Sequence, residues 1–199
     1  MKKRRAVFLD RDGTLNVDVG YPHDYGQVEI YPRGVEAVRR LNRAGLLTLV
    51  VTNQSGIGRG LLTERELWEI HARMGDALRA ENARVDGWYY CPHYEASAHA
   101  VFRKACACRK PRPGMALQAA RDFNLDLEAS YMIGDKVEDI EFGRAFGATP
   151  VLVLTGYGAR SLRAFQARPV RPAFVAADVL DAVRWILARE NDGRPGRAR

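Results

Sequence analysis

Short apolar runs alternate with stretches of helical periodicity along the chain. The clearest runs are rich in Val, Ile and Leu and have the length of strands buried on both faces of a parallel sheet. We predict strong strands at residues 6–9, 46–52, 131–134 and 150–154, and weaker ones at 87–90 and 174–175.

Helical patterns fill most of the segments between these runs. Val35, Val38 and Leu41 share one face of a predicted helix. Thr63 is the predicted N-cap of the next helix, because Glu66 three residues later completes a capping box. The predicted helices cover residues 33–44, 63–82, 113–123, 137–146 and 178–189.

Strands that alternate with helices indicate an α/β fold. We predict a Rossmann-like three-layer sandwich with a mostly parallel sheet. Residues 91–113 have no periodicity and form a loop between two elements. We expect one domain over residues 1–191 and a disordered basic tail over residues 192–199.

The net charge of +7 is concentrated near the chain ends. Residues 2–5 carry four positive charges and residues 192–199 a net two, which leaves a single net charge for residues 6–191. A nucleic-acid-binding protein concentrates basic residues on its folded face, so we expect no nucleic-acid partner. No apolar run approaches the ~20 residues that span a bilayer, and the apolar stretch after the basic N-terminus is too short for a signal peptide. We therefore expect a cytoplasmic monomer with no membrane partner.

Acidic residues follow two of the predicted strands. Asp10 and Asp12 come after the first strand, and Asp135 follows the strand at 131–134. Ligands of open parallel sheets bind at the carboxyl ends of the strands, so we expect these acids and Thr52 to meet there. A cation would relieve the repulsion between the carboxylates. The alternative for the first pair alone is a polar turn in which Gly13 adopts a positive φ.

Four motifs occur in a specific order: Asp10-Arg11-Asp12-Gly13-Thr14, an apolar strand ending in Thr52, Lys110, and Gly134-Asp135 with Asp139. Together they resemble the haloacid dehalogenase superfamily of phosphohydrolases, over roughly residues 6–190. The resemblance implies that Asp10 is the nucleophile that forms an aspartyl-phosphate. Asp12 would act as general acid and then as general base, while Thr52 and Lys110 would hold the phosphoryl oxygens. Mg²⁺ would bind the carboxylates of Asp10 and Asp135 and the backbone carbonyl of Asp12.

A second group of metal-ligand residues lies in the loop at 91–110. Cys91-Pro92-His93 and Cys106-Ala107-Cys108 supply four ligands that suit a closed, structural Cys3His zinc site. The alternative is three buried free thiols and an unrelated histidine, but the residues between the pairs are too polar to form a core. A zinc site here would hold the two cationic residues that follow the last cysteine.

Within the superfamily, this loop resembles the families of heptose 1,7-bisphosphate 7-phosphatases and of histidinol-phosphate phosphatases. The segments that match the heptose enzymes are 16–21, 52–57, 91–93, 106–111 and 134–136. The resemblance implies an open site without a large cap domain and a small phosphorylated sugar as substrate, in nucleotide-activated heptose biosynthesis. It also implies a set of substrate-binding residues, to which we add Arg59 as a candidate cation: Asp18, Gly20, Tyr21, Asn53, Gln54, Ser55, Arg59, Arg109 and Lys136.

Several interpretations stay open from the sequence. Histidinol phosphate is the rival substrate, and Arg109 beside Lys110 favours a bisphosphate. A DNA 3′-phosphatase or a non-catalytic, zinc-stapled binding protein are further alternatives. We expect Asp139 to orient the metal shell, with a solvated helix-terminal acid as the alternative; Lys136 is either a phosphate ligand or a charge partner of Asp135. His23, His71 and His99 are interpreted as ordinary surface or partly buried histidines, and Trp68, Trp88 and Trp185 as packing residues rather than a stacking platform.

Overall fold

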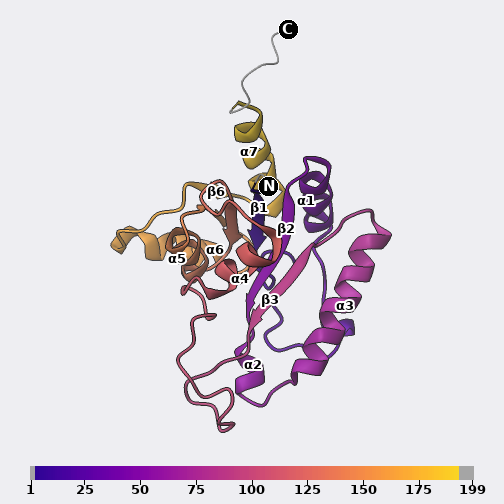
Figure 1. The fold of residues 1–199 in the computed structure, drawn as a ribbon, viewed down its shortest axis with the longest axis vertical. Coiled ribbons are helices and arrows are strands. Elements are labelled where there is room, and N and C mark those ends of the chain that lie inside the picture. Colours follow the sequence, from indigo (N-terminus) through magenta and orange to yellow (C-terminus); the bar gives the residue numbers. More distant parts are fainter. Residues whose placement is uncertain (1–2, 193–199) are drawn as a thin grey trace.

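The computed structural model of the protein describes residues 3–192. A single sheet of six strands, all parallel, runs through its centre in the order β3-β2-β1-β4-β5-β6 (Figure 1). The strands are β1 (Ala6–Leu9), β2 (Leu47–Asn53), β3 (Gly87–Cys91), β4 (Tyr131–Gly134), β5 (Thr149–Val153) and β6 (Phe174–Ala176). The predicted α/β class is confirmed.

The sheet changes its direction of growth at β1. After β1 the chain adds β2 and β3 on one side, and then returns to add β4, β5 and β6 on the other. Val7 pairs with Tyr131 of β4 and Leu9 pairs with Val50 of β2, so β1 lies between the two halves. In sheets of this kind ligands bind at such a switch point, beyond the carboxyl ends of the strands. The acidic motif after β1 begins at this point.

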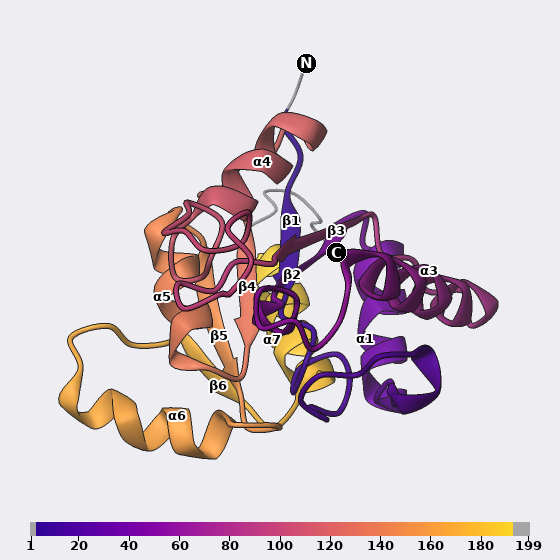
Figure 2. The ribbon, with the colours of Figure 1, turned by 90° about the horizontal axis from the view of Figure 1, so that it is seen from below.

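Helices cover both faces of the sheet and make three layers (Figure 2). Val7 and Leu9 of β1 pack in one core with helices α1, α3 and α7, while Ala6 and Phe8 pack on the other face with α4 and α5. This alternation follows from the period-two geometry of a strand. The helices are α1 (Pro32–Arg43), α2 (Ser55–Gly58), α3 (Glu64–Ala80), α4 (Gly114–Phe123), α5 (Val137–Ala145), α6 (Gly158–Ala164) and α7 (Val179–Asp192).

The predicted start of α3 is confirmed by its capping box. The Thr63 hydroxyl accepts the backbone N–H of Glu66 at 3.2 Å, and the Glu66 carboxylate accepts the N–H of Thr63 at 2.6 Å. The helix ends at Ala80, two residues before its predicted end, because Asn82 adopts a left-handed φ of 55°. Asn is one of the few residues that tolerate this conformation.

Other differences concern short or terminal segments. The helices α2 and α6 and the two 3₁₀ turns at 25–27 and 165–167 are not predicted, because they are too short to show periodicity. Helix α7 continues through Asp192, the first residue of the predicted tail, and residues 193–199 lie outside the described residues. Among residues 3–192, no helix is both long enough and apolar enough to cross a membrane.

Candidate active site

A pocket of about 580 Å³ opens at the carboxyl ends of the strands. It collects most of the predicted site residues, from the loops after β1, β2 and β4 and from the segment before α4. Its walls are Asp10, Asp12, Asp18, Gly20, Tyr21, Thr52, Asn53, Gln54, Ser55, Arg109, Lys110, Pro111, Lys136, Glu138, Asp139 and Tyr157. Asp135 lies behind this wall, fully buried and grouped with Asp10 and Asp139.

The structure does not bring Arg59 to this pocket. The Arg59 guanidinium lies 3.8 Å from the ring centroid of Tyr94, in a cation–π contact with the loop between β3 and α4. Arg59 follows the short helix α2, which turns its end toward that loop. The expectation that Arg59 contacts the substrate is therefore dropped.

Lys110 stands at the centre of the site and is 4% exposed. Its Nζ donates to Oδ1 of Asp10 at 2.7 Å, to Oδ1 of Asp139 at 2.6 Å and to the carbonyl of Val51 at 2.9 Å. Burial alone would lower the pKa of Lys110, but the two carboxylates outweigh this effect and raise it. Lys110 is therefore a charged group that stays charged throughout the physiological pH range.

The backbone of Lys110 is held as firmly as its side chain. Its N–H donates to Oδ1 of Asn53 at 3.0 Å, and Nδ2 of Asn53 donates to the carbonyl of Lys110 at 3.2 Å. This reciprocal pair joins the end of β2 to the segment before α4. Asn53 thus anchors the loop that carries Lys110, a role that its place in the sequence motif does not indicate.

Three buried carboxylates form a group that fits a divalent cation. Oxygen atoms of Asp10, Asp135 and Asp139 lie within 4.8 Å of one another, and Oδ1 of Asp135 has no hydrogen-bond partner among the described residues. Burial, followed by the charges of Asp10 and Asp139, raises the pKa of Asp135 to about 8. Burial also raises the pKa of Asp10, to about 6, although Lys110 opposes this shift. An all-oxygen donor set of this kind suits Mg²⁺.

Two glycines let the backbone approach Asp135. A Cβ on Gly13, which has a φ of +87°, would lie 2.4 Å from Oδ2 of Asp135, and one on Gly156, with a φ of +54°, would lie 2.3 Å from the same atom. Oδ2 of Asp135 accepts the N–H of Tyr157 at 2.7 Å, directly after Gly156. Any side chain at either glycine would displace this carboxylate.

Asp139 is held from two sides. Besides the contact with Lys110, its Oδ2 accepts the backbone N–H of Lys136 at 2.9 Å. The residue is 1% exposed, which argues against a solvated helix-terminal acid. Asp139 is therefore placed to orient its neighbours, and it also belongs to the group of three carboxylates that fits a divalent cation.

Lys136 bridges the outer part of the pocket. Its Nζ donates to Oδ2 of Asp18 at 3.1 Å and lies 5.0 Å from the ring centroid of Tyr157. Burial would lower the pKa of Lys136, but Asp10, Asp135 and Asp18 together raise it. The positive charge of Lys136 therefore balances the charges of three acids, and not that of Asp135 alone.

The Asp12 carboxylate accepts four hydrogen bonds. Oδ1 accepts from Nε of Arg11 at 3.0 Å and from Nδ2 of Asn16 at 3.1 Å; Oδ2 accepts from Nη2 of Arg11 and Nε2 of Gln54, each at 2.9 Å. Burial would raise the pKa of Asp12, but the charge and hydrogen bonds of Arg11 outweigh it and lower the pKa. Nε2 of Gln54 also donates to the Thr52 hydroxyl at 2.9 Å, which links Thr52 to the same group.

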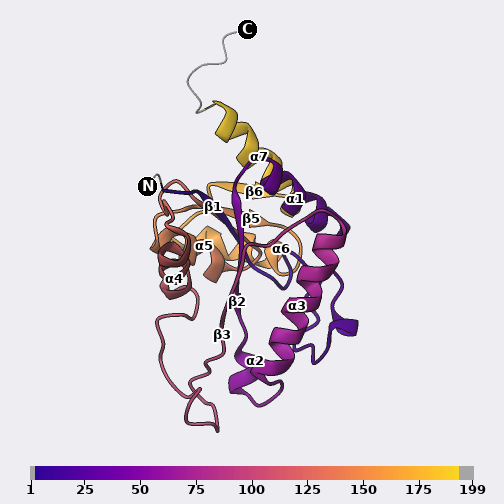
Figure 3. The ribbon, with the colours of Figure 1, turned by 45° about the vertical axis from the view of Figure 1, so that its right-hand side comes forward.

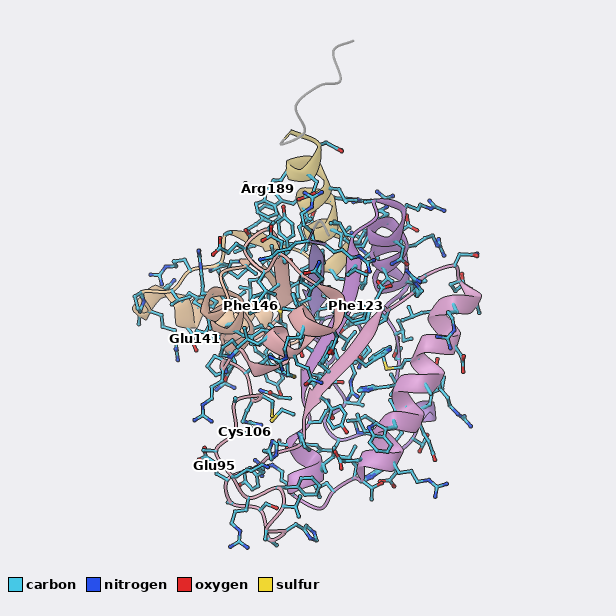
Figure 4. All side chains as sticks on the ribbon, in the orientation of Figure 1. Glu95, Cys106, Phe123, Glu141, Phe146 and Arg189 are labelled. Atoms are coloured by element: carbon cyan, nitrogen blue, oxygen red, sulfur yellow. The ribbon has the colours of Figure 1, made fainter. Side chains whose placement is uncertain are left out.

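The four predicted zinc ligands meet beside this pocket, in the loop between β3 and α4 where Figure 4 labels Cys106. The Sγ atoms of Cys106 and Cys108 are 3.3 Å apart, and Nδ1 of His93 is 3.2 Å from Sγ of Cys108. These sulfurs are too far apart for a disulfide and are grouped around one point with Cys91. Hydrogen bonding from Cys91 lowers the pKa of Cys108, which favours the thiolate form that binds metals, while the same hydrogen bond raises the pKa of Cys91. The cluster therefore fits a metal ion.

The metal-ligand cluster and the pocket share a segment of chain. Figure 3 shows the loop that extends from β3 past the end of the sheet and returns to α4. Arg109 follows the last cysteine, and its Nη1 donates to the carbonyl of His93 at 3.4 Å. Lys110 is the next residue, so whatever fixes the cluster also fixes the central cation of the site.

Several residues that lie near the acids of the pocket are not among the site residues predicted from the sequence. Arg11 and His71 are 0% and 5% exposed and lie behind Asp12, where Nη1 of Arg11 and Nε2 of His71 are 3.1 Å apart. The interpretation of His71 as an ordinary surface or partly buried residue is corrected. Tyr157 and Glu138 line the pocket. Only the place of Arg11 between two motif acids, and of Glu138 beside Asp139, signals them in the sequence.

Comparisons with known proteins agree with this geometry. Residues 107–182 match the family model described as HAD-hydrolase-like. The D-glycero-beta-D-manno-heptose-1,7-bisphosphate 7-phosphatase of Escherichia coli O6:H1 is 45% identical over 92% of this chain and 88% of its own length, and that of Salmonella typhi is 46% identical over 92% and 89%. The crystal structure of D,D-heptose 1,7-bisphosphate phosphatase from B. bronchiseptica, complexed with magnesium and phosphate, superposes with a TM-score of 0.83 at 32% identity, covering 93% of this chain and 99% of that one.

The raised pKa of Asp135 predicts a pH-dependent stability in magnesium-free buffer. A carboxyl whose pKa is about 8 in the folded protein, against 3.8 ordinarily, holds its proton more tightly when folded. The protonated carboxyl contributes to the free energy of unfolding in full below about pH 4, and this contribution is lost as the pH rises through about 8. The shift corresponds to a loss of ~4 kcal/mol between pH 5 and 9. We expect the Tm of the wild type to fall by roughly 10 °C more than that of Asp135→Asn over this range, since ~1 kcal/mol moves the Tm of a domain of this size by about 2–4 °C.

Thermal unfolding without chelator measures this difference, because a chelator would also remove any metal held by the cysteine cluster. Asp76→Asn is the matched control, since the Asp76 side chain is 71% exposed and remote from the pocket. Added Mg²⁺ should stabilise the wild type more at pH 9 than at pH 5. The same change of Tm with pH in the wild type and in Asp135→Asn would contradict the assignment of Asp135 as a buried, cation-binding acid with a raised pKa.

Proposed function

The chain belongs to the haloacid dehalogenase-like phosphatases, in one family with the heptose bisphosphate 7-phosphatases described above, and we propose that it removes the 7-phosphate of D-glycero-D-manno-heptose 1,7-bisphosphate. The observation that carries this proposal is the convergence of Asp10, Asp12, Lys110 and the group around Asp135 at one pocket. Phosphoryl transfer needs a nucleophile, a proton donor and balanced charge in one place. The pocket supplies all three.

Asp10 is the proposed nucleophile. A carboxylate oxygen of Asp10 forms a bond to phosphorus while the bond from phosphorus to the sugar oxygen breaks. Asp12, once protonated, gives its proton to that oxygen, so the sugar leaves as a neutral alcohol. Asp12 then takes a proton from water as the water oxygen attacks phosphorus, and Asp10 is released as a carboxylate with free phosphate.

Charge balance is the task of the surrounding residues. Lys110 and the Thr52 hydroxyl are proposed to hold the phosphoryl oxygens that carry charge in the transition state. We assign a Mg²⁺ site to the carboxylates of Asp10 and Asp135 and the backbone carbonyl of Asp12; when bound, the ion would offset the repulsion between the phosphate and the acids. The unpartnered Oδ1 of Asp135 supports this assignment.

The outer pocket is proposed to bind the sugar and the second phosphate. Arg109 is the proposed phosphate-binding cation, and Asn53 at the end of β2 and Gln54 and Ser55 directly after it are the proposed further substrate contacts. Asp18, Gly20 and Tyr21 wall the far side, and Lys136 is proposed to move from Asp18 to an incoming phosphate. These assignments complete the substrate site without Arg59.

The biological setting follows from the proposed reaction. A heptose 7-phosphatase would work in the cytoplasm, in nucleotide-activated heptose and lipopolysaccharide biosynthesis, on a small phosphorylated sugar rather than on nucleic acid. We propose that a single domain over residues 1–191 carries the activity and that it acts as a monomer. We further propose that the Cys3His cluster binds structural Zn²⁺.

Competition between two substrates tests the proposed function. Phosphate release is measured with Mg²⁺ for heptose 1,7-bisphosphate and histidinol phosphate at equal concentration. We expect kcat/KM to favour the bisphosphate, and Arg109→Ala to lower it roughly 10–100-fold for the bisphosphate, since charge-assisted hydrogen bonds contribute about 1.5–3 kcal/mol each. The loss should lie mainly in KM, because the second phosphate takes no part in the chemistry.

Arg103→Ala is the matched control, because Arg103 is an exposed arginine of the same loop that does not line the pocket. A preference for histidinol phosphate, unaffected by Arg109→Ala, would overturn the substrate assignment and leave the Asp10 chemistry in place. Release from neither substrate would overturn the proposed function.

The zinc assignment predicts that one ligand substitution lowers both metal content and activity. Cys108→Ser should reduce bound zinc, measured by elemental analysis, from about one ion per chain, and should lower the Tm and kcat together, because Lys110 lies two residues from Cys108. Lys104→Ala, at an exposed position of the same loop, is the control. Full activity in Cys108→Ser, or a wild-type protein purified without zinc, would contradict the assignment.

A further inference from the structure

Asp12 is supported by two buried side chains that the proposed reaction does not use. We propose that Arg11 and His71 form a positioning pair, which holds the Asp12 carboxylate in the orientation needed for proton transfer. This inference rests on the proposed function, since it concerns the residue assigned as general acid and base. It adds two residues, one of them on α3, that neither line the pocket nor belong to a metal-binding group themselves.

Arg11 grips Asp12 through a two-point contact. Nε of Arg11 donates to Oδ1 of Asp12 at 3.0 Å and Nη2 donates to Oδ2 at 2.9 Å. Two parallel hydrogen bonds fix the plane of a carboxylate, and Asn16 and Gln54 each add one more hydrogen bond to it. A fully buried guanidinium is costly to desolvate, so its remaining donors also need partners.

His71 supplies a partner for the third nitrogen of Arg11. Nη1 of Arg11 lies 3.1 Å from Nε2 of His71. Since arginine only donates hydrogen bonds, Nε2 must accept, which makes His71 a neutral imidazole with its proton on Nδ1. Burial, followed by the charge of Arg11, lowers the pKa of His71 to about 3, in agreement with this neutral form.

The ring of His71 is itself fixed by aromatic neighbours. It stacks on Trp88 of β3, with ring centroids 4.6 Å apart and an interplanar angle of 23°, and meets the ring of Tyr90 at 6.3 Å. Helix α3 carries His71 and lies alongside this edge of the sheet (Figure 3). A chain of contacts therefore runs from β3 and α3 through His71 and Arg11 to Asp12.

A purely structural role for the pair makes a different prediction from a positioning role. If His71 only fills the space between α3 and the sheet, its loss should weaken the protein and slow every substrate alike. If it positions Asp12, its loss should slow most those substrates whose leaving group needs a proton. An alkyl phosphate such as the heptose bisphosphate needs one, while 4-nitrophenyl phosphate releases a stable phenolate and does not.

The test compares kcat/KM for these two substrates, because this parameter covers the steps up to phosphorylation of the enzyme. His71→Leu removes the acceptor for Arg11, and His71→Gln retains one. General acid catalysis contributes about 10²–10⁴-fold, and a misaligned acid keeps part of it, so we expect a loss of about tenfold for the heptose bisphosphate in His71→Leu. The loss for 4-nitrophenyl phosphate should stay below about twofold, and His71→Gln should recover most of the activity.

Met74→Ala is the control, since Met74 is buried on the same helix and its loss destabilises the protein without touching Arg11. The Tm of each variant shows whether it is folded. An equal loss on both substrates, a His71→Gln variant as impaired as His71→Leu, or the same substrate split in Met74→Ala would overturn the positioning role. Failure of the wild type to release phosphate from either substrate would instead overturn the proposed function and the positioning role with it.

Discussion

The structure depends on how it accommodates negative charge at one edge of its sheet. Asp10, Asp12, Asp135 and Asp139 are all less than 9% exposed there. Buried carboxylates are expensive unless cations or hydrogen-bond donors face them. Lys110 faces two of them, and Arg11 faces Asp12. Asp135 is left with a raised pKa and an unpartnered oxygen, which is why the site is poised for a divalent cation and an anionic substrate.

The same constraint explains the loop that carries the cysteine cluster. Lys110 can neutralise two acids only if its backbone is held against the end of β2, and the reciprocal bonds with Asn53 hold it there. The metal-ligand cluster lies immediately before Lys110, and a metal ion bound there would fix this segment at a smaller entropic cost than ordering a free loop. A loop held by a metal ion would thus keep Lys110 in position in a small phosphatase, where packing against a larger domain would otherwise be needed.

Most of what could be predicted of the fold and the site rests on short sequence patterns. Apolar strands, the capping box of Thr63 and the acids after β1 and β4 are each readable from a few neighbouring residues. The contact between Arg11 and His71 joins residues sixty positions apart, and no periodicity indicates it. Arg59 lies outside the pocket wall, because the direction of the loop after a four-residue helix depends on packing, here against Tyr94. The pocket wall at Tyr157 depends on the turn at Gly156, whose approach to Asp135 only the folded chain reveals.

The central claim is that Asp10 carries the phosphoryl group during turnover. The most direct measurement is peptide mapping by mass spectrometry after rapid acid quench, using Asp12→Asn protein incubated with Mg²⁺ and 4-nitrophenyl phosphate, whose leaving group needs no proton from Asp12. Because this variant lacks the base for the second step, the intermediate should accumulate, and the account predicts one hydroxylamine-sensitive phosphoryl group on Asp10. Release of phosphate in a single turnover with no phosphorylated peptide, or a phosphoryl group on any other residue, would contradict the account.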